Sequence, residues 1–180
     1  VASGAVMHYL AETQHHKLQH ITAIERILEG DYVWMDKFTI RNLELIGNGA
    51  DRKGLLEVID ATKSPMGARL LKRWLIFPLQ NVTQINNRLD AVETLLNEPA
   101  ASADISELIE SCGDLERLSS KLSTRKLQPR EFMQLAKSLE AIEQIKQALS
   151  PIDNDYLQHV NKELDICANS KKIILATLME

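Results

Sequence analysis

The sequence predicts an all-α protein, an irregular helical bundle with long lever-type helices and one small β-hairpin near the N-terminus. Apolar residues recur at three- and four-residue steps over most of the chain, as they do along the buried face of a helix. Aromatic residues make up only 4% of the 180 residues, so the core must come mainly from Leu, Ile, Val and Ala. Proline and capping residues stand where these apolar stripes begin and end.

The N-terminal part is expected to be mixed in structure. Residues 2–14 have helical spacing, whereas 21–35 fit no clean period and contain a β-prone run after a Glu-Gly-Asp turn, which predicts the hairpin. Asp36 can cap a helix that runs through Ile46. A loop with three glycines, residues 47–54, should separate that helix from the next short one.

The segment from 60 to 79 specifies one short, tightly fixed helix over 65–76. Ser64 can cap it, Pro65 suits the first helical position, and Pro78 ends it. Four residues fall on one face, and Met66 is expected in the core with them, whereas Gly67 is expected to let another helix approach closely. The residues of that face are Leu70, Leu71, Trp74 and Leu75.

Five further helices are expected in the second half of the chain, over about 82–97, 105–112, 115–122, 129–149 and 155–180. The first of these carries an apolar stripe of Val82, Ile85, Leu89, Val92 and Leu96.

The last predicted helix would have about 26 residues and be roughly 39 Å long, so its far end should project from a small bundle. Lys171 interrupts its apolar seam. Ile173, Ile174, Leu175 and Leu178 should then lack cover within the chain, and the end is expected to fray, fold back or pair with another copy. The chain starts and stops inside helical patterns, which suggests a piece of a longer protein.

Composition narrows the classes of function. A net charge of −4 gives no general attraction to nucleic acid, so a DNA contact would need a local basic patch. The two cysteines, Cys112 and Cys167, form no disulfide framework and no C-x-x-C pair, which favours the reducing cytoplasm. Both are expected on apolar helix faces, as inert thiols. We expect no membrane span, because the sequence contains no run of about 18 apolar residues.

Three patterns could suggest an active or metal site, and each has a simpler interpretation. The glycine loop has the spacing of a P-loop, but Leu55 and Leu56 occupy the positions of the Lys and the hydroxyl residue, so no nucleotide site is expected. Asp114 and Glu116 lie two apart and should point in different directions, as an N-cap and a surface charge. Residues of metal-ligand type recur at helical steps, although no further ligand is evident on another helix, so polar surface is expected instead. They are His8, Glu12, His15, His16 and His20.

The best functional candidate is a basic run from Arg117 to Arg130 that contains no acidic residue. It could contact DNA phosphates, or it could be a solvated face or the partner of acids on a neighbouring helix. The candidate phosphate contacts are Lys121, Arg125, Lys126 and Arg130.

These landmarks resemble a known family. Residues 60–79 resemble the hallmark of the core, or lever, domain of the MutS family of DNA mismatch repair proteins. The matching residues are Asp60, Thr62, Pro65, Met66, Gly67, Arg69, Leu71, Trp74, Leu75, Pro78 and Leu79, with Ser64 in place of the usual Thr. A second motif precedes that segment at Asp36, Thr39 and Arg41–Leu45. Later family landmarks follow the segment in order, at Ile85, Arg88 and Asp90–Val92, then at Asp114–Arg117 and Pro129–Glu131.

The resemblance implies that 1–20 is a helix leading from the connector domain and that 21–180 is the first part of the core domain. It implies a structural connector without catalysis in this chain, coupling an ATPase domain to the DNA clamp and the mismatch-recognition domains of a cytoplasmic parent. ATP and magnesium are implied for the parent, with no cofactor or metal in these residues, and the implied partners are mismatched duplex DNA and a second copy of the parent. A free-standing helical adaptor and a metal-dependent hydrolase using the histidines stay open as alternatives.

Overall fold

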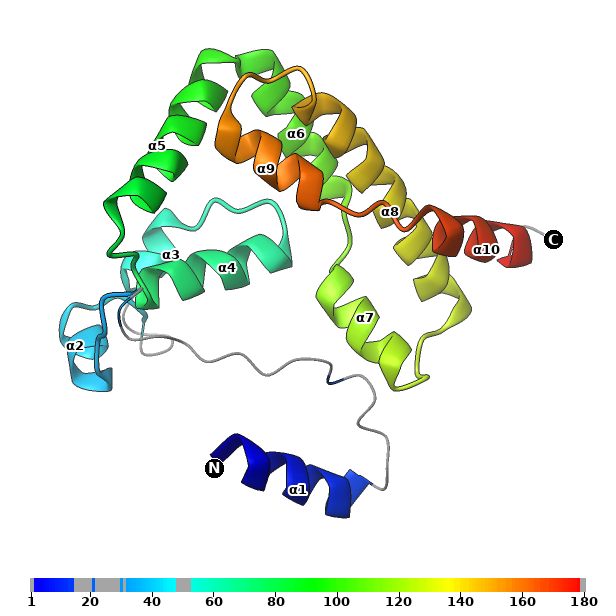
Figure 1. Cartoon of the computed structure of the whole chain (residues 1–180), viewed down its shortest axis with the longest axis horizontal. Helices are drawn as coiled ribbons and strands as arrows, with labels where there is room; N and C mark the ends of the chain where they lie inside the picture. The colour runs from blue at the N-terminus through cyan, green and yellow to red at the C-terminus, as the bar shows by residue number, and fades with distance from the viewer. Residues whose placement is uncertain (1, 15–20, 22–29, 31, 48–52, 179–180) are drawn as a thin grey trace.

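The structure is a computed structural model that describes residues 2–14, 21, 30, 32–47 and 53–178. Over these residues the regular secondary structure is helical, apart from one isolated antiparallel bridge between Tyr32 and Leu79, and turns and loops connect the helices (Figure 1). The all-α prediction is confirmed. Most of the predicted hairpin lies outside the described residues, and its described end pairs elsewhere, because Val33 N donates to Pro78 O at 2.8 Å.

The helices of the described residues follow one another with short connections. They are α1 (Ala2–Gln14), α2 (Lys37–Asn42), α3 (Leu55–Ile59), α4 (Pro65–Ile76), α5 (Val82–Asn97), α6 (Pro99–Ser111), α7 (Leu115–Ser123), α8 (Pro129–Leu149), α9 (Asp155–Glu163) and α10 (Ala168–Leu178). The predicted helices over 2–14, 65–76, 82–97, 115–122 and 129–149 are confirmed within a residue or so of their ends.

The core lies between α5, α6, α8 and α9, and α6 packs along α8 (Figure 1). The inner face of α8 carries the small residues Ala136, Ser138 and Ala141, of which Ser138 is only 1% exposed. Small side chains let the two helix backbones approach closely, and Ser138 Oγ also accepts a hydrogen bond from Gly113 N at 2.9 Å. The buried apolar residues that α5, α6, α8 and α9 contribute to one cluster make these four helices one packed body, which we call the bundle.

A second packed group, the α3–α4 unit (residues 53–76), is fastened to the loop that precedes it. Gly47 N and Gly54 N both donate to the Glu57 carboxylate, at 3.1 and 2.7 Å. A Cβ on Gly54 would lie 2.5 Å from Gly47 N, so only glycine fits this crossing of two backbones. Leu56 is the buried residue of α3.

The helix that Asp36 caps is shorter than predicted. Thr39 N donates to Asp36 Oδ1 at 2.7 Å, which confirms the N-cap, but α2 ends at Asn42 and not at Ile46. Glu44 turns the chain with a φ of 50°, and its carbonyl oxygen then accepts from Leu55 N at 2.8 Å. The positive φ of Glu44 ends the helix before Ile46, and the carbonyl oxygens of Glu44 and Leu45 accept from the first residues of α3.

The local design of α4 is confirmed, whereas its predicted burial is wrong. Ser64 Oγ accepts from Gly67 N at 3.1 Å and Pro65 opens the helix. No residue of α4 is buried, and Trp74 and Leu70 are 38% and 46% exposed. The neighbours that a Cβ on Gly67 would meet are atoms of Ser64 and Thr62 in the adjoining loop, and not another helix.

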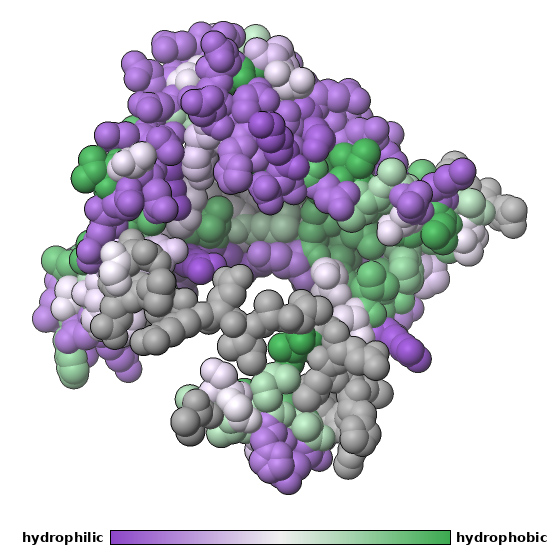
Figure 2. Space-filling model, viewed as in Figure 1, coloured by the Kyte–Doolittle hydropathy of each residue, from purple (hydrophilic) through white to green (hydrophobic). Residues whose placement is uncertain are grey.

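The apolar stripe predicted to bury α5 also lies largely outside the core. Val82, Leu89, Val92 and Leu96 are more than half exposed, and the helix instead packs through Ala91, which is 5% exposed. Figure 2 shows that the visible surface is mainly hydrophilic over the upper part of the molecule, with hydrophobic areas where α7 and α8 meet. In the part of the chain that is described, periodicity identified the helix but not the face that packs.

The prediction of a single long C-terminal helix over 155–180 is wrong, because the structure has two helices there. Helix α9 ends at Glu163, where Lys146 Nζ of α8 donates to Asn161 O and Leu164 O at 3.0 and 2.8 Å. Cys167 then has a φ of 44°, which no residue within a helix has. It is exposed, and so does not lie in an apolar seam.

Helix α10 starts a new direction and lies against α8, which brings Lys171 to an ion pair with Glu143 of α8. Ile174 and Leu175 are half-buried there, whereas Ile173 is 66% and Leu178 37% exposed. The segment therefore does not project as predicted, and of the three outcomes expected for it, folding back onto the chain is the one that α10 shows.

Candidate nucleic-acid interface

The basic run predicted from the sequence forms the corner between α7 and α8. Arg125 turns the chain with a φ of 57°, and Lys126 N donates to Lys121 O at 2.9 Å. Pro129 then opens α8, and Gln128 N donates to Glu131 Oε2 at 3.0 Å to close the capping box. The corner is held by these hydrogen bonds and by Leu118, the buried residue of α7.

Among the four predicted phosphate contacts, Lys121 is the one whose side chain pairs with an acid within the chain. Its Nζ forms a half-buried ion pair with Glu131 Oε1. The hydrogen bond from Lys121, with a smaller contribution from Gln128 N, lowers the pKa of the Glu131 carboxyl. The alternative in which basic residues of the run serve acids on a neighbouring helix therefore holds for Lys121, whose charge is compensated by Glu131.

Arg125, Lys126 and Arg130 are the other basic residues of this predicted set, and they lie at the corner between α7 and α8. All three are exposed, two in the turn and one in the first turn of α8. Closely spaced exposed cations can contact phosphate oxygens, which give affinity without sequence selectivity. The geometry is compatible with phosphate contact, which stays a prediction for these residues.

The structure also shows a charged cluster that sequence reasoning missed. Arg69 of α4 donates through Nε to Glu116 Oε2 at 2.6 Å, and through Nη1 and Nη2 to Asp114 Oδ2 and Oδ1 at 3.0 and 2.6 Å. Asp114 is the N-cap predicted for α7, with Arg117 N donating to Oδ1 at 3.2 Å. The two acids do not point apart as expected, because both converge on Arg69.

The electrostatics agree with this geometry. The hydrogen bond from Arg69 is the main cause that lowers the pKa of Asp114, and the two acids, Asp114 first, raise the pKa of Arg69. Arg69 and Asp114 both belong to motifs noted in the sequence, which marked each residue singly. They lie 45 residues apart, and no local sequence pattern indicates that they are in contact.

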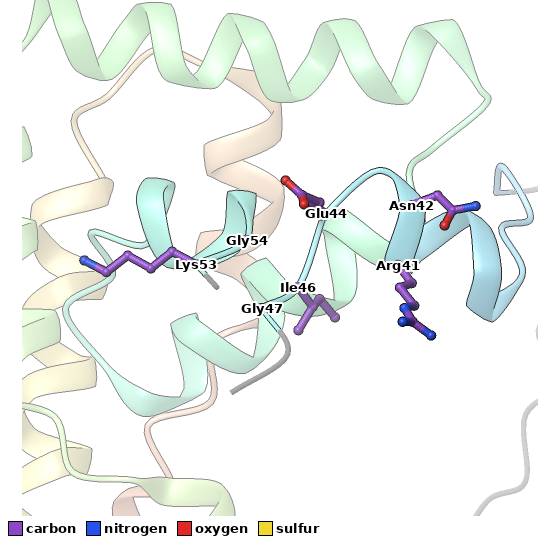
Figure 3. A pocket seen from close by; sticks show the side chains of 7 residues that line it. All are labelled: Arg41, Asn42, Glu44, Ile46, Gly47, Lys53 and Gly54. Atoms are coloured by element: carbon purple, nitrogen blue, oxygen red, sulfur yellow. The ribbon is translucent and has the colours of Figure 1, made fainter. Parts of the chain in front are cut away.

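The glycine loop borders a polar pocket of about 270 Å³. Figure 3 shows its lining side chains, of which Arg41 and Lys53 point away from one another and do not converge on one ligand position. Residues 48–52 of the loop lie outside the described residues. Leu55 and Leu56, at the positions of the Lys and the hydroxyl residue of a P-loop, are the first two residues of α3, and the absence of a nucleotide site stays a prediction.

The other candidates from the sequence are the histidines near the N-terminus and the buried cysteine. His8 and Glu12 form an exposed pair at 3.5 Å on α1, while His15, His16 and His20 lie outside the described residues. No metal-binding group of His, Cys, Asp and Glu is found in the described part of the chain. Cys112 is buried, which raises the pKa of its thiol. None of the described helices is long and apolar enough to span a membrane.

Comparison with known proteins identifies relatives over the whole chain. A model of MutS domain III matches residues 38–180. The DNA mismatch repair protein MutS of Christiangramia forsetii is 48% identical over 181 residues, which cover 100% of this chain and 21% of that protein. The proteins of the same name from Phocaeicola vulgatus and Bacteroides thetaiotaomicron are 47% and 49% identical, covering 97% and 93% of this chain and 20% of each relative. The chain thus spans about a fifth of the length of these relatives.

Proposed function

The chain belongs to the MutS family of DNA mismatch repair proteins, in which it corresponds to domain III, and from that premise we propose that it is a mechanical connector. In the parent protein it would couple the nucleotide state of an ATPase domain to the grip of the clamp on mismatched duplex DNA. The observation that carries the proposal is the domain III match over residues 38–180, supported by relatives that align with the whole chain.

The packing suits this role. A connector has to transmit displacement, which requires elements that move as bodies and do not deform. The long helix α8 contacts α6, α7, α9 and α10, and its buried Ala136, Ser138 and Ala141 permit close packing on the bundle. Such a rod would carry a movement of one end to the other.

We place catalysis and cofactor binding outside this chain. ATP and magnesium would belong to a separate domain of the parent, which would act as a homodimer in the cytoplasm. The support from these residues is the lack of the Lys and hydroxyl that a P-loop needs after Gly54. Isothermal titration of the 180-residue chain with ATP and magnesium should therefore give no saturable heat, and micromolar binding would contradict this part of the proposal.

A chimera tests the coupling role directly. The matching segment of the Christiangramia forsetii MutS protein is replaced by this chain, and binding to a mismatched duplex is followed before and after ATP is added. We expect mismatch binding and ATP-dependent release to match those of the unmodified relative. A chimera that binds mismatched DNA but keeps it when ATP is added would overturn the proposal.

Two matched variants of the chimera separate packing from surface effects. Ala141→Leu inserts volume at a position that is 6% exposed, where overpacking forces the helices of the bundle to shift, so we expect weaker coupling. Lys137→Leu places the same new side chain on the exposed side of α8, where it displaces no packed neighbour, and should leave coupling intact. Equal behaviour of the two variants would mean that the bundle does not carry the signal.

A further inference from the structure

The α3–α4 unit is not part of the packed bundle. No residue of α4 is buried, and α3 buries only Leu56. The buried apolar cluster that unites α5, α6, α8 and α9 contains no residue of the unit. Met66, Leu71 and Leu75 of α4 are half-buried, but no fully buried apolar residue ties the unit to the bundle or to α7 beside it.

Charged side chains make that connection. Figure 1 shows α4 running from a start near α7 back to the beginning of α5, so its first turns face α7. Arg69 from these turns makes the bidentate contact with Asp114 and the further contact with Glu116. A second ion pair, Lys63 to Glu110 of α6 at 3.6 Å, lies on the same side.

The opposite end of α4 has a different attachment. The Arg88 guanidinium of α5 lies 3.7 Å from the centroid of the Trp74 ring, and Asn81 caps α5 by accepting from Gln84 N. The short connection 77–81 joins the two helices there. The unit is thus covalently joined and stacked at one end, and held by ion pairs at the other.

These two ends differ in strength in a way that suits movement. Exposed ion pairs are individually weak and are screened by salt, whereas a bidentate Arg–carboxylate contact fixes one geometry. We propose that Arg69, Asp114 and Glu116 form an ionic latch that fixes the α3–α4 unit to the α6–α7 corner. When the latch opens, the unit swings about the 77–81 connection while the bundle keeps its packing.

Asp114 links the latch to the start of a helix. The same carboxylate that receives Arg69 also caps α7 through Arg117 N. Movement of the unit would therefore be felt at the first turn of α7 and, through it, at the α7–α8 corner. The latch gives the proposed connector a movable joint, but it rests on contacts within the chain and needs no DNA or nucleotide.

Electron paramagnetic distance measurement on the full 180-residue chain tests the latch. Nitroxide labels are attached at Lys72→Cys on α4 and Ser119→Cys on α7, both exposed sites, in a Cys167→Ser background that leaves the buried Cys112 unlabelled. At low salt we expect one narrow distance distribution. At about 1 M salt, where the Debye length is about 3 Å, we expect the distribution to broaden toward longer distances.

Variants identify the residues responsible. Arg69→Gln should give the broad distribution already at low salt, and Arg69→Lys an intermediate one, because Lys keeps the charge without the bidentate contact. Arg73→Gln removes the same charge from the same helix and should leave the narrow distribution. Since Glu116 does not cap α7, Glu116→Gln supplies a milder opening if Arg69→Gln fails to fold, and it should broaden the distribution in part.

Two results would overturn the latch. A distribution that stays narrow in Arg69→Gln or, should that variant fail to fold, in Glu116→Gln would show that other contacts hold the unit. A wild-type distribution that does not respond to salt would contradict the latch as well. Neither result bears on the coupling function, which the chimera tests by ATP-dependent release of DNA.

Discussion

Arg88 lies over the Trp74 ring, with its guanidinium carbon 3.7 Å from the ring centroid, and the indole is 38% exposed. The sequence placed Trp74 in the core because it shares a helix face with Leu71 and Leu75. Helical spacing defines which residues share a face, but the partner for that face comes from elsewhere in the chain. For Trp74 the contact that the structure shows is a cationic side chain, while Leu71 and Leu75 of the same face are half-buried.

Truncation of Trp74 should therefore cost less than removal of a fully buried aromatic residue, which is typically worth about 3 to 5 kcal/mol. We expect Trp74→Ala to lower the free energy of unfolding by about 2 kcal/mol, from partial burial and the lost cation–π contact. Trp34→Ala, at a tryptophan that is 67% exposed, should cost less than about 1 kcal/mol. Urea unfolding of both variants gives the two values.

A loss near 4 kcal/mol for Trp74→Ala would restore the core interpretation. Equal losses for the two tryptophans would show that the Arg88 contact contributes nothing measurable.

Helix N-capping was the most predictable property of individual residues. Asp36, Ser64 and Asp114 were all expected as N-caps, and each accepts a hydrogen bond from the backbone N–H three residues on. The signal is local, since the side chain and its donor lie within one turn. The Arg69 contacts are equally specific but join residues 45 positions apart, which no local pattern encodes.

At the scale of helices, the break between α9 and α10 decides the shape of the C-terminal part. The apolar spacing continues across 164–167, so the sequence indicated one helix. The break depends on tertiary contacts, because Lys146 of α8 donates to the last carbonyl groups of α9 and Glu143 of α8 pairs with Lys171 of α10. Asp165 Oδ1 also accepts from Cys167 N at 2.8 Å, which stabilises the turn.

Substitution of Cys167 discriminates the broken helix from a continuous one by the sign of the effect. With a φ of 44°, this position favours glycine, and so we expect Cys167→Gly to be more stable than Cys167→Ala by about 1 kcal/mol. In a continuous helix the order would reverse, with glycine about 1 kcal/mol less stable than alanine. Thermal or urea unfolding of the pair at one pH measures the difference.

For the whole molecule, the sequence predicted an all-helical fold and the family, because helix caps and motif residues are local. It could not predict which helices share the core. The exposed Val82, Leu89 and Leu96 have good helical spacing, yet α5 packs through Ala91. Small residues carry little hydrophobic signal and gain importance only where two backbones approach.

The charge distribution over the molecule sets the expected behaviour toward DNA. With a net charge of −4, we expect the isolated chain to bind duplex DNA weakly, without sequence preference, and to release it as salt rises to the physiological range. The triple variant Arg125→Ala, Lys126→Ala, Arg130→Ala should abolish this binding at low salt. Fluorescence anisotropy over a salt series measures it.

Two controls give this experiment its specificity. Removal of three exposed lysines elsewhere, Lys137, Lys162 and Lys172, takes away the same charge and should weaken binding much less. Lys121→Ala should lower stability, because Glu131 loses its partner, with little change in DNA affinity. Binding that survives physiological salt, or that the triple variant retains, would refute the corner as a phosphate contact.

A connector with a movable joint requires two bodies that differ in stability, and native-state hydrogen exchange measures that difference most directly. We predict that amides in the middle of α6 and α8 exchange only through global unfolding. Amides of α4 should exchange through a local opening whose free energy is lower than that of global unfolding. At about 1 M salt the α4 amides should exchange faster still relative to α8, because the Arg69 contacts are screened. If the α4 amides were as protected as those of α8 at low and high salt alike, the described chain would be one rigid body and the two-body connector would be contradicted.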